Sequence, residues 1–288
     1  MDFLQPTSWL DALAVKSERP EAMPIAGGTD VMVELNFDVR RPAALLDLTR
    51  VPELAEWAVY DGRVRLGAAV TYTQVIAELT DRLPGLAIAS RTVGSPQIRN
   101  RGTVGGNLGA ASPAGDSHPI LLAVDAEVEA ASVTGTRRIP VAEFFTGVKR
   151  HALRPDELIA AVWVPAATGP QQFCKIGTRN AMVIAVTAFA IALHPERRRV
   201  GTGFGSAAAT PRPAPEAEEF LSQALAEEGL WESRAAPRDS VVRRFGELVA
   251  DAASPIDDVR GTAGYRRHGL QVMARRAFTW AWNDYRKA

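Results

Sequence analysis

Cysteine is almost absent from this chain of 288 residues, which contains Cys174 alone. A single thiol cannot form an intrachain disulfide, and it cannot supply the several thiolate ligands of an iron-sulfur cluster or a cysteine-rich zinc site. The four histidines are scattered without the spacing of metal ligands, at His118, His151, His194 and His268. We therefore assign no metal site to this chain, and we expect Cys174 to be a packing residue of an apolar strand.

An excess of charge of one sign is also missing. Thirty-three basic residues balance 33 acidic ones, so no global field attracts nucleic acid or an anionic membrane. No run approaches the ~18 uninterrupted apolar residues of a membrane-spanning helix, and the N-terminus lacks the basic stretch and apolar core of a secretory signal. We expect a cytoplasmic globular protein that binds no nucleic acid and has no membrane span. A chain of this length suits two or three compact units.

Two common phosphate-binding patterns, GxGxxG and GxxxxGK[ST], are absent as well. The chain has two other glycine-rich segments instead, IAGGTDV at residues 25 to 31 and QIRNRGTVGGNLGAASPAGDSHP at residues 97 to 119. Glycine tolerates positive φ and lets a ligand approach the main chain, so such loops offer bare N–H groups to an anion. Either segment alone is more typical of a simple turn. Together they predict a ligand with two phosphates, held from both sides mainly by backbone amides and hydroxyls.

The hydrophobic pattern predicts an α+β chain that begins with two units. Residues 1 to 55 are expected to form a small α/β unit, with a first helix over the apolar positions from Phe3 to about residue 17 that Ser8 or Thr7 caps. A second helix, at residues 31 to 37, would follow the first glycine loop and add its N-terminal amides to phosphate binding. Residues 56 to 168 are expected to form a larger α+β unit built on a sheet, with the glycine loops meeting at the border of the two units. Its signals are hairpins at Asp61-Gly62 and within residues 126 to 139, and a strand at residues 158 to 165.

A third unit is expected over residues 173 to 288, after a linker at residues 166 to 172. Strands at residues 173 to 177, 184 to 193 and 199 to 205 would form a small antiparallel sheet. Helices would pack on this sheet at about residues 216 to 227, 241 to 253 and 264 to 282. We interpret the charged block at residues 227 to 239 as a surface excursion.

The two glycine segments also resemble a known family. AGGTD at residues 26 to 30, followed by IRNRGTVGGNLGAASPAGDSHP at residues 98 to 119, is similar to the paired flavin loops of the FAD-binding medium subunits of the xanthine dehydrogenase and carbon monoxide dehydrogenase family. KIGTRNAMVIAV at residues 175 to 186 and SPIDDVRGTAGYRRHGLQVMARRAF at residues 254 to 278 resemble that family's C-terminal domain. The resemblance implies a two-part FAD-binding domain of the PCMH type followed by the C-terminal domain of the flavoprotein subunit.

The same resemblance implies roles for individual residues, all of them in FAD binding and none in catalysis. Two segments would bind the pyrophosphate from opposite sides: Ala26, Gly27, Gly28, Thr29 and Asp30 on one side, and Thr103, Gly105, Gly106 and Asn107 on the other. The threonine hydroxyls would donate hydrogen bonds and the glycines would permit close backbone approach, while the Asp30 side chain is expected to cap backbone amides.

Three isolated residues complete the implied site. Asp116 would bind a ribose hydroxyl of the AMP half, with an Asx turn or helix cap as the alternative. Lys175 would lie close to the flavin and favour its anionic reduced ring; without the resemblance it would be an exposed strand lysine. Ile159 would make an apolar backbone contact to the cofactor or serve only in the core.

Other conspicuous side chains are expected to be structural. We interpret His118 as part of a proline-flanked turn. The basic residues of the last helix form either a solvated face or a partner contact: Arg266, Arg267, His268, Arg275 and Arg276. Arg99 and Arg101 could hold loop geometry or face a partner, and the sequence does not separate these two roles.

The resemblance implies an FAD-bearing electron-transfer subunit of a molybdenum hydroxylase. It would work with an iron-sulfur subunit and a molybdopterin subunit, as a heterotrimer or its dimer, and would pass electrons to an external acceptor. The alternative is a stand-alone FAD-dependent oxidase or dehydrogenase of the same superfamily, and a third hypothesis is a nucleotide-binding regulatory protein. The organic substrate, the acceptor and the oligomeric state stay open.

Overall fold

The N-terminal part of the chain is a small parallel sheet with two helices. The computed structural model describes all 288 residues. Strands β1 (Asp2–Leu4) and β2 (Met23–Ile25) flank the fully buried β3 (Ala44–Asp47), and α1 (Trp9–Glu18) and α2 (Val31–Asn36) lie in the connections. Ser8 caps α1, since its hydroxyl accepts a hydrogen bond from the Asp11 N–H at 3.2 Å. The expected cap at Ser8 is thus confirmed, but Phe3 was wrongly included in the helical pattern, because it lies in β1 and pairs with Leu45.

A five-stranded antiparallel sheet forms the middle of the molecule. Its order is β4-β5-β10-β6-β7, and the turn between β4 and β5 places both Asp61 and Gly62 at positive φ, as a two-residue hairpin requires. The strands are β4 (Trp57–Tyr60), β5 (Arg63–Gly67), β6 (Glu127–Ser132), β7 (Gly135–Pro140) and β10 (Leu158–Pro165). The shorter elements around them are η1 (Pro52–Ala55), α3 (Tyr72–Glu78), α4 (Pro84–Arg91), α5 (Pro96–Arg101), α6 (Val104–Ala110), α7 (His118–Ala123), α8 (Val141–Phe144), β8 (Phe145–Gly147) and β9 (Arg150–His151).

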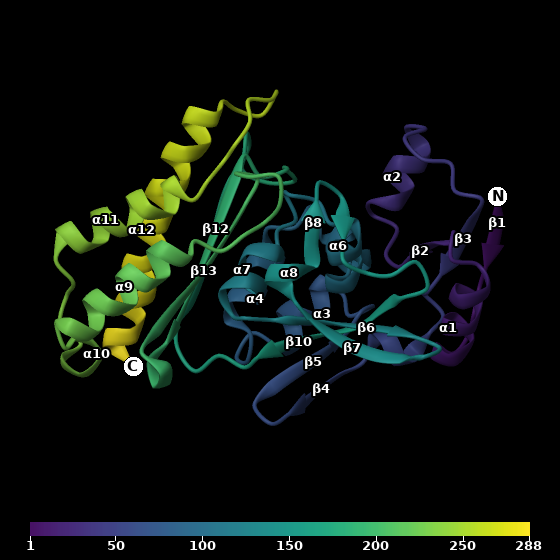
Figure 1. Cartoon of the computed structure of the whole chain (residues 1–288), viewed down its shortest axis with the longest axis horizontal. Coiled ribbons are helices and arrows are strands. Elements are labelled where there is room, and N and C mark those ends of the chain that lie inside the picture. Colours follow the sequence, from purple (N-terminus) through teal and green to yellow (C-terminus); the bar gives the residue numbers. More distant parts are fainter.

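The C-terminal part is a three-stranded antiparallel sheet under a layer of helices. Strands β11 (Gln171–Ile176), β12 (Thr187–His194) and β13 (Arg199–Gly205) pair in sequence order. Helices α9, α11 and α12 lie together on the far side of this sheet, away from α4 and α7 (Figure 1). The short helix η2 (Pro195–Arg197) connects β12 and β13. The helices of the layer are α9 (Pro215–Glu227), α10 (Leu230–Ser233), α11 (Asp239–Asp251) and α12 (Ala263–Lys287).

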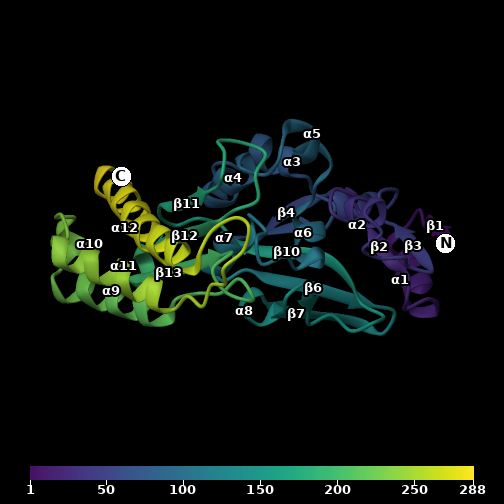
Figure 2. The same ribbon diagram turned by 90° about the horizontal axis from the view of Figure 1, so that it is seen from above.

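Strand β12 separates two hydrophobic cores. Alternate residues of a strand face opposite sides, and here Ala188, Ala190 and Ala192 join a core that reaches back to Ala12 in α1. Phe189, Ile191 and Leu193 join the core under α9, α11 and α12. The three parts therefore follow one another along the long axis, with the two termini at opposite ends (Figure 2).

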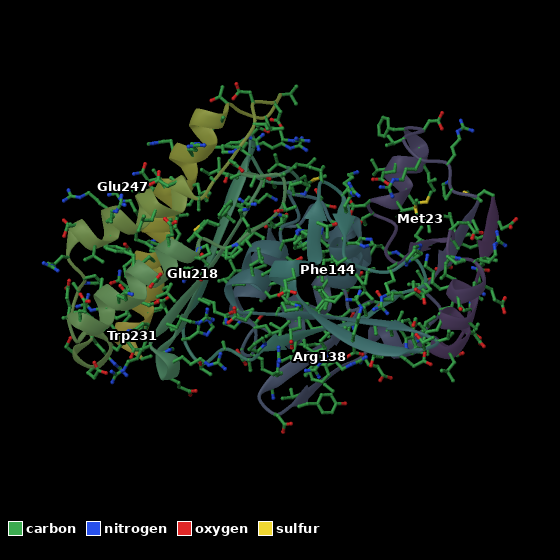
Figure 3. The ribbon with its side chains drawn as sticks, in the orientation of Figure 1. Met23, Arg138, Phe144, Glu218, Trp231 and Glu247 are labelled. Atoms are coloured by element: carbon green, nitrogen blue, oxygen red, sulfur yellow. The ribbon has the colours of Figure 1, made fainter.

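Two expectations for the C-terminal part were wrong. The block at residues 227 to 239 is not only a surface excursion, because α10 carries Leu230 and Trp231, which are 5% and 4% exposed. Trp231 lies within the helical layer (Figure 3) and stacks edge-on against Trp282 of α12. Arg266 is not on a solvated face either, since it is 4% exposed and donates to the carbonyl oxygens of Val186 and Ser206.

None of the helices is both long and apolar enough to pass through a bilayer.

Candidate functional site

A cavity of about 930 Å³ opens where the three parts of the chain meet. Both glycine segments line it, together with residues 93 to 95 before α5, residues 151 to 159 around β10, and residues 182 to 184 after β11. Eleven of the twelve sequence-predicted site residues line this cavity: Ala26, Gly27, Gly28, Thr29, Asp30, Thr103, Gly105, Gly106, Asn107, Asp116 and Ile159. The twelfth, Lys175, contacts one of them. A volume of this size lies in the range of cofactor and small-molecule sites.

The backbone of the first glycine segment is arranged to bind an anion. None of the N–H groups of residues 26 to 30 donates a hydrogen bond within the protein. Buried or half-buried amides without an acceptor are rare in folded proteins. Because all five residues line the cavity, these amides are available to a ligand there, and successive N–H groups of this kind attract phosphate oxygens.

The two glycine segments are in direct contact. A Cβ on Gly27 would lie 1.8 Å from the carbonyl oxygen of Arg101, so only glycine lets the two main chains approach this closely. Gly28 has φ +75°, a left-handed conformation that other residues adopt with strain. The expectation that the loops meet is therefore confirmed, and each glycine of the first loop has its own physical reason.

The second glycine segment contains a short helix, not only the loop that we expected. Residues 104 to 110 form α6, and neither Gly105 nor Gly106 has positive φ. Thr103 caps the helix, since its hydroxyl oxygen accepts from the Gly106 N–H at 2.9 Å. Gly105 is buried against Ala68, because a Cβ on Gly105 would lie only 2.6 Å from the main-chain oxygen of Ala68. Gly105 therefore serves packing, whereas the exposed Gly106 faces the cavity.

Asp116 and Lys175 form a buried ion pair at the cavity wall. The Lys175 Nζ lies 2.7 Å from Oδ2 of Asp116, and their side chains are 8% and 10% exposed. Lys175 also donates to the carbonyl oxygen of Thr92 at 3.2 Å, so it is not the exposed lysine of the alternative interpretation. The second carboxylate oxygen, Oδ1, is buried and has no partner. Burial raises the pKa of Asp116 to about 6, although the lysine opposes this shift.

Two further predicted residues differ in how far the geometry supports their roles. Ile159 is 8% exposed and lines the cavity beside a β-bulge, where the pairing of β10 with β6 shifts between Ile159 and Ala161. On the other side of the strand, the Ala160 carbonyl oxygen accepts from Ala68 N–H at 3.0 Å. Asp30 precedes α2, but its side chain caps no backbone amide, so that expectation was wrong.

Several lining residues have no signal in the sequence. Lys16 reaches the cavity wall from α1 and donates to the carbonyl oxygens of Pro20 and Ala22 at 2.7 and 2.8 Å. The Tyr72 hydroxyl is buried without a hydrogen-bond partner. Met182 and Ile184, from the segment after β11, line the cavity and are 56% and 54% exposed. Tertiary structure alone brings these residues to the glycine segments, and no local pattern marks them.

The comparisons with known proteins cover nearly the whole chain. Residues 1 to 167 match the model of the FAD binding domain in molybdopterin dehydrogenase, and residues 172 to 281 match the model of the CO dehydrogenase flavoprotein C-terminal domain. The chain is similar to the nicotine 6-hydroxylase medium subunit of Paenarthrobacter nicotinovorans, with 30% identity over 95% of this chain and 94% of the relative. It is also similar to the xanthine dehydrogenase FAD-binding subunit of Escherichia coli O157:H7, with 30% identity over 93% and 91% of the two chains.

The fold agrees with these matches. A chain of carbon monoxide dehydrogenase from Hydrogenophaga pseudoflava superposes with a TM-score of 0.87 and 26% identity, covering 99% of this chain and 98% of the other. The two-part FAD-binding fold and the C-terminal domain with a small antiparallel sheet and helices are thus confirmed. This chain belongs to the family of FAD-binding medium subunits of the molybdenum hydroxylases, and its cofactor is FAD.

Proposed function

We propose that this chain takes electrons from an iron-sulfur partner subunit and passes them to an external acceptor. The partner and a molybdopterin subunit would complete the complex, as a heterotrimer or its dimer. The observation that carries this proposal is a group of apolar side chains that both line the cavity and remain exposed, namely Val33, Ile98, Met182 and Ile184. Exposed apolar surface of this kind is typical of a protein contact.

The residues of the cavity fit FAD on three observations. The five free amides of residues 26 to 30 match the charge of a diphosphate. The unpartnered Oδ1 of Asp116 offers an acceptor to a hydroxyl or N–H group of a ligand. The cavity is long enough to be lined by both Lys16 and Ile184, from the first and last parts of the chain. FAD supplies the redox chemistry when bound, and the protein binds, orients and tunes it.

The ion pair bears on the orientation of the cofactor. The resemblance assigned Asp116 to a ribose of the AMP half and Lys175 to the flavin, but the two side chains are in contact. We propose that both serve the flavin end, beside residues 182 to 184, and that the adenosine lies toward Ile159. A buried lysine near the flavin would favour negative charge on the reduced ring.

Relatives with the same architecture support the assembly. The match from Paenarthrobacter nicotinovorans is a medium subunit of a hydroxylase, and the first domain model describes a part of molybdopterin dehydrogenases.

Two further expectations stay predictions. One is the division of the chain into residues 1 to 55, 56 to 168 and 173 to 288, and the other is the cytoplasmic location.

Reduction of the purified subunit tests the proposed function. We expect dithionite to bleach the bound flavin, and we expect aldehydes, purines and carbon monoxide to leave it oxidised. Co-expression with an iron-sulfur and a molybdenum subunit should restore bleaching by the substrate of the complex. Rapid reduction of the isolated subunit by such a substrate would contradict the proposal and favour the stand-alone oxidase.

A further inference from the structure

Asn107 is held from two sides by the segment that follows α6. Ser117 donates its hydroxyl proton to the side-chain Oδ1 of Asn107 at 2.8 Å. The ring Nε2 of His118 lies 3.2 Å from the main-chain oxygen of the same residue. Both Ser117 and His118 are 0% exposed, whereas Asn107 lines the cavity. The contacts therefore reach from the core to a cavity residue.

The contact of His118 is fixed by its surroundings. Burial lowers the pKa of His118 to about 4, so the ring is neutral at physiological pH. Since a carbonyl oxygen only accepts, this contact requires the ring proton on Nε2. The Asn107 carbonyl is one of the last four of α6, and the N–H of Ala111 donates to Leu108 instead, so His118 satisfies an otherwise open helix end.

The ring of His118 cannot easily move away. Its centroid lies 4.6 Å from that of Phe145. On the other side, a Cβ at Gly115 would lie 2.2 Å from the ring Cε1, so glycine is needed there to admit the ring. The main chain of Asn107 is thus held by a clamped histidine, and its side chain can be directed by Ser117.

The hydrogen bond from Ser117 engages the oxygen end of the Asn107 amide. With Oδ1 engaged by the serine, the amide nitrogen Nδ2 lies on the opposite arm, and its two N–H groups find no acceptor in the protein. We propose that Ser117 is a positioning residue, which directs the Asn107 amide into the cavity as a hydrogen-bond donor to an acceptor oxygen of the cofactor. This inference rests on the proposed binding of FAD in this cavity.

A double-mutant cycle on FAD affinity tests the proposal. The flavin is removed from the purified chain, and FAD is titrated back into the wild type, Ser117→Ala, Asn107→Ala and the double variant. We expect Ser117→Ala to weaken binding about five- to tenfold, the usual effect of one hydrogen bond. If Ser117 acts through Asn107, the double variant binds as weakly as Asn107→Ala alone, because coupled residues are not additive. A serine with only a structural role would give additive losses, which would overturn the proposal.

Three further arms complete the experiment. Ser132→Ala removes another buried serine, which contacts Thr134 and does not line the cavity, and should leave FAD affinity unchanged. Asn107→Asp keeps an acceptor for Ser117 but replaces the donor by an oxygen, so it should bind FAD more weakly than Asn107→Ala. Binding equal to the wild type would overturn the proposal.

Titration with ADP-ribose, which has the diphosphate without the flavin, identifies the part of FAD that accepts the hydrogen bond. An equal loss of ADP-ribose affinity in Ser117→Ala assigns it to the ADP half of FAD, and a loss confined to FAD assigns it to the flavin half.

The outcomes separate this inference from the proposed function. A wild-type chain that takes up no FAD would contradict the assignment of the cavity itself. A wild-type chain that binds FAD, with Ser117→Ala binding equally well, would overturn the positioning role alone. Thermal unfolding of each flavin-free variant confirms that the folded state is compared throughout.

Discussion

Two effects act in opposite directions on the pKa of Asp116, which is buried and paired with Lys175. Burial disfavours the ionised carboxylate, and the ammonium 2.7 Å away favours it. Burial is the larger effect, because the pKa of Asp116 is raised to about 6 from an ordinary 3.8. The folded flavin-free chain therefore retains a proton that the unfolded chain has already released.

The pH dependence of stability tests this effect. In the window between the pKa values of about 3.8 and 6, the folded state binds more protons than the unfolded state, so the free energy of unfolding falls as pH rises. We expect Asp116→Asn to lack this contribution. The measurement is chemical denaturation of the flavin-free wild type and variant at several pH values across the window. The difference in their unfolding free energies should change with pH in this direction, and a constant difference would contradict the raised pKa.

Gly28 and Gly62 form a matched pair for testing the first glycine loop. Their φ angles are +75° and +74°, but Gly28 lines the cavity and Gly62 lies in an open hairpin turn with no atom near its missing Cβ. Alanine at either position should lower stability by about 1 kcal/mol through backbone strain. Only Gly28→Ala should also lower FAD affinity. Equal FAD affinity of the two variants in titration would show that the loop does not contact the cofactor.

At the scale of elements, one buried arginine of α12 hydrogen-bonds the main chain at the ends of β12 and β13. Arg266 donates to the carbonyl oxygens of Val186 and Ser206 at 2.9 and 2.6 Å and pairs with Asp258. The adjacent Arg267 is exposed and forms no ion pair. One side chain therefore links the long helix to the segments that flank β12 and β13.

The two neighbouring arginines predict very different effects on stability. Arg266→Met leaves two carbonyl oxygens without their charged donor, and we expect a loss of about 2 to 4 kcal/mol. Arg267→Ala should change stability by no more than about 0.5 kcal/mol. Urea denaturation of both variants measures the difference. Similar effects of the two substitutions would contradict the structural role of Arg266.

Local patterns predicted most elements but not the second glycine segment. The hairpin at Asp61-Gly62 and the strand at residues 158 to 165 follow from turn chemistry and β-branched residues, and both formed as expected. Residues 104 to 110 contain three glycines, which are poor helix formers, yet they form α6. The cap by Thr103 and the packing of Gly105 on Ala68 stabilise this helix, and the second of these is a tertiary contact that no local pattern contains.

At the scale of the whole molecule, the cavity depends on all three parts of the chain. The glycine segments come from the first two parts, while Lys175 and residues 182 to 184 come from the third. The resemblance selected residues that the structure brings to one cavity, but it assigned Asp116 and Lys175 to different ends of the cofactor, whereas the two side chains are in contact. Their contact spans 59 positions in the chain, so only the packing of α7 against the β11 to β13 sheet could reveal it.

The central claim is that the five free amides of residues 26 to 30 and the cavity around them hold one FAD without a covalent bond. The most direct measurement is the amount and identity of flavin bound to the purified chain. We predict one flavin per chain, released by acid or heat and identified as FAD. FMN in its place, or a colourless chain that takes up no added FAD, would contradict the account.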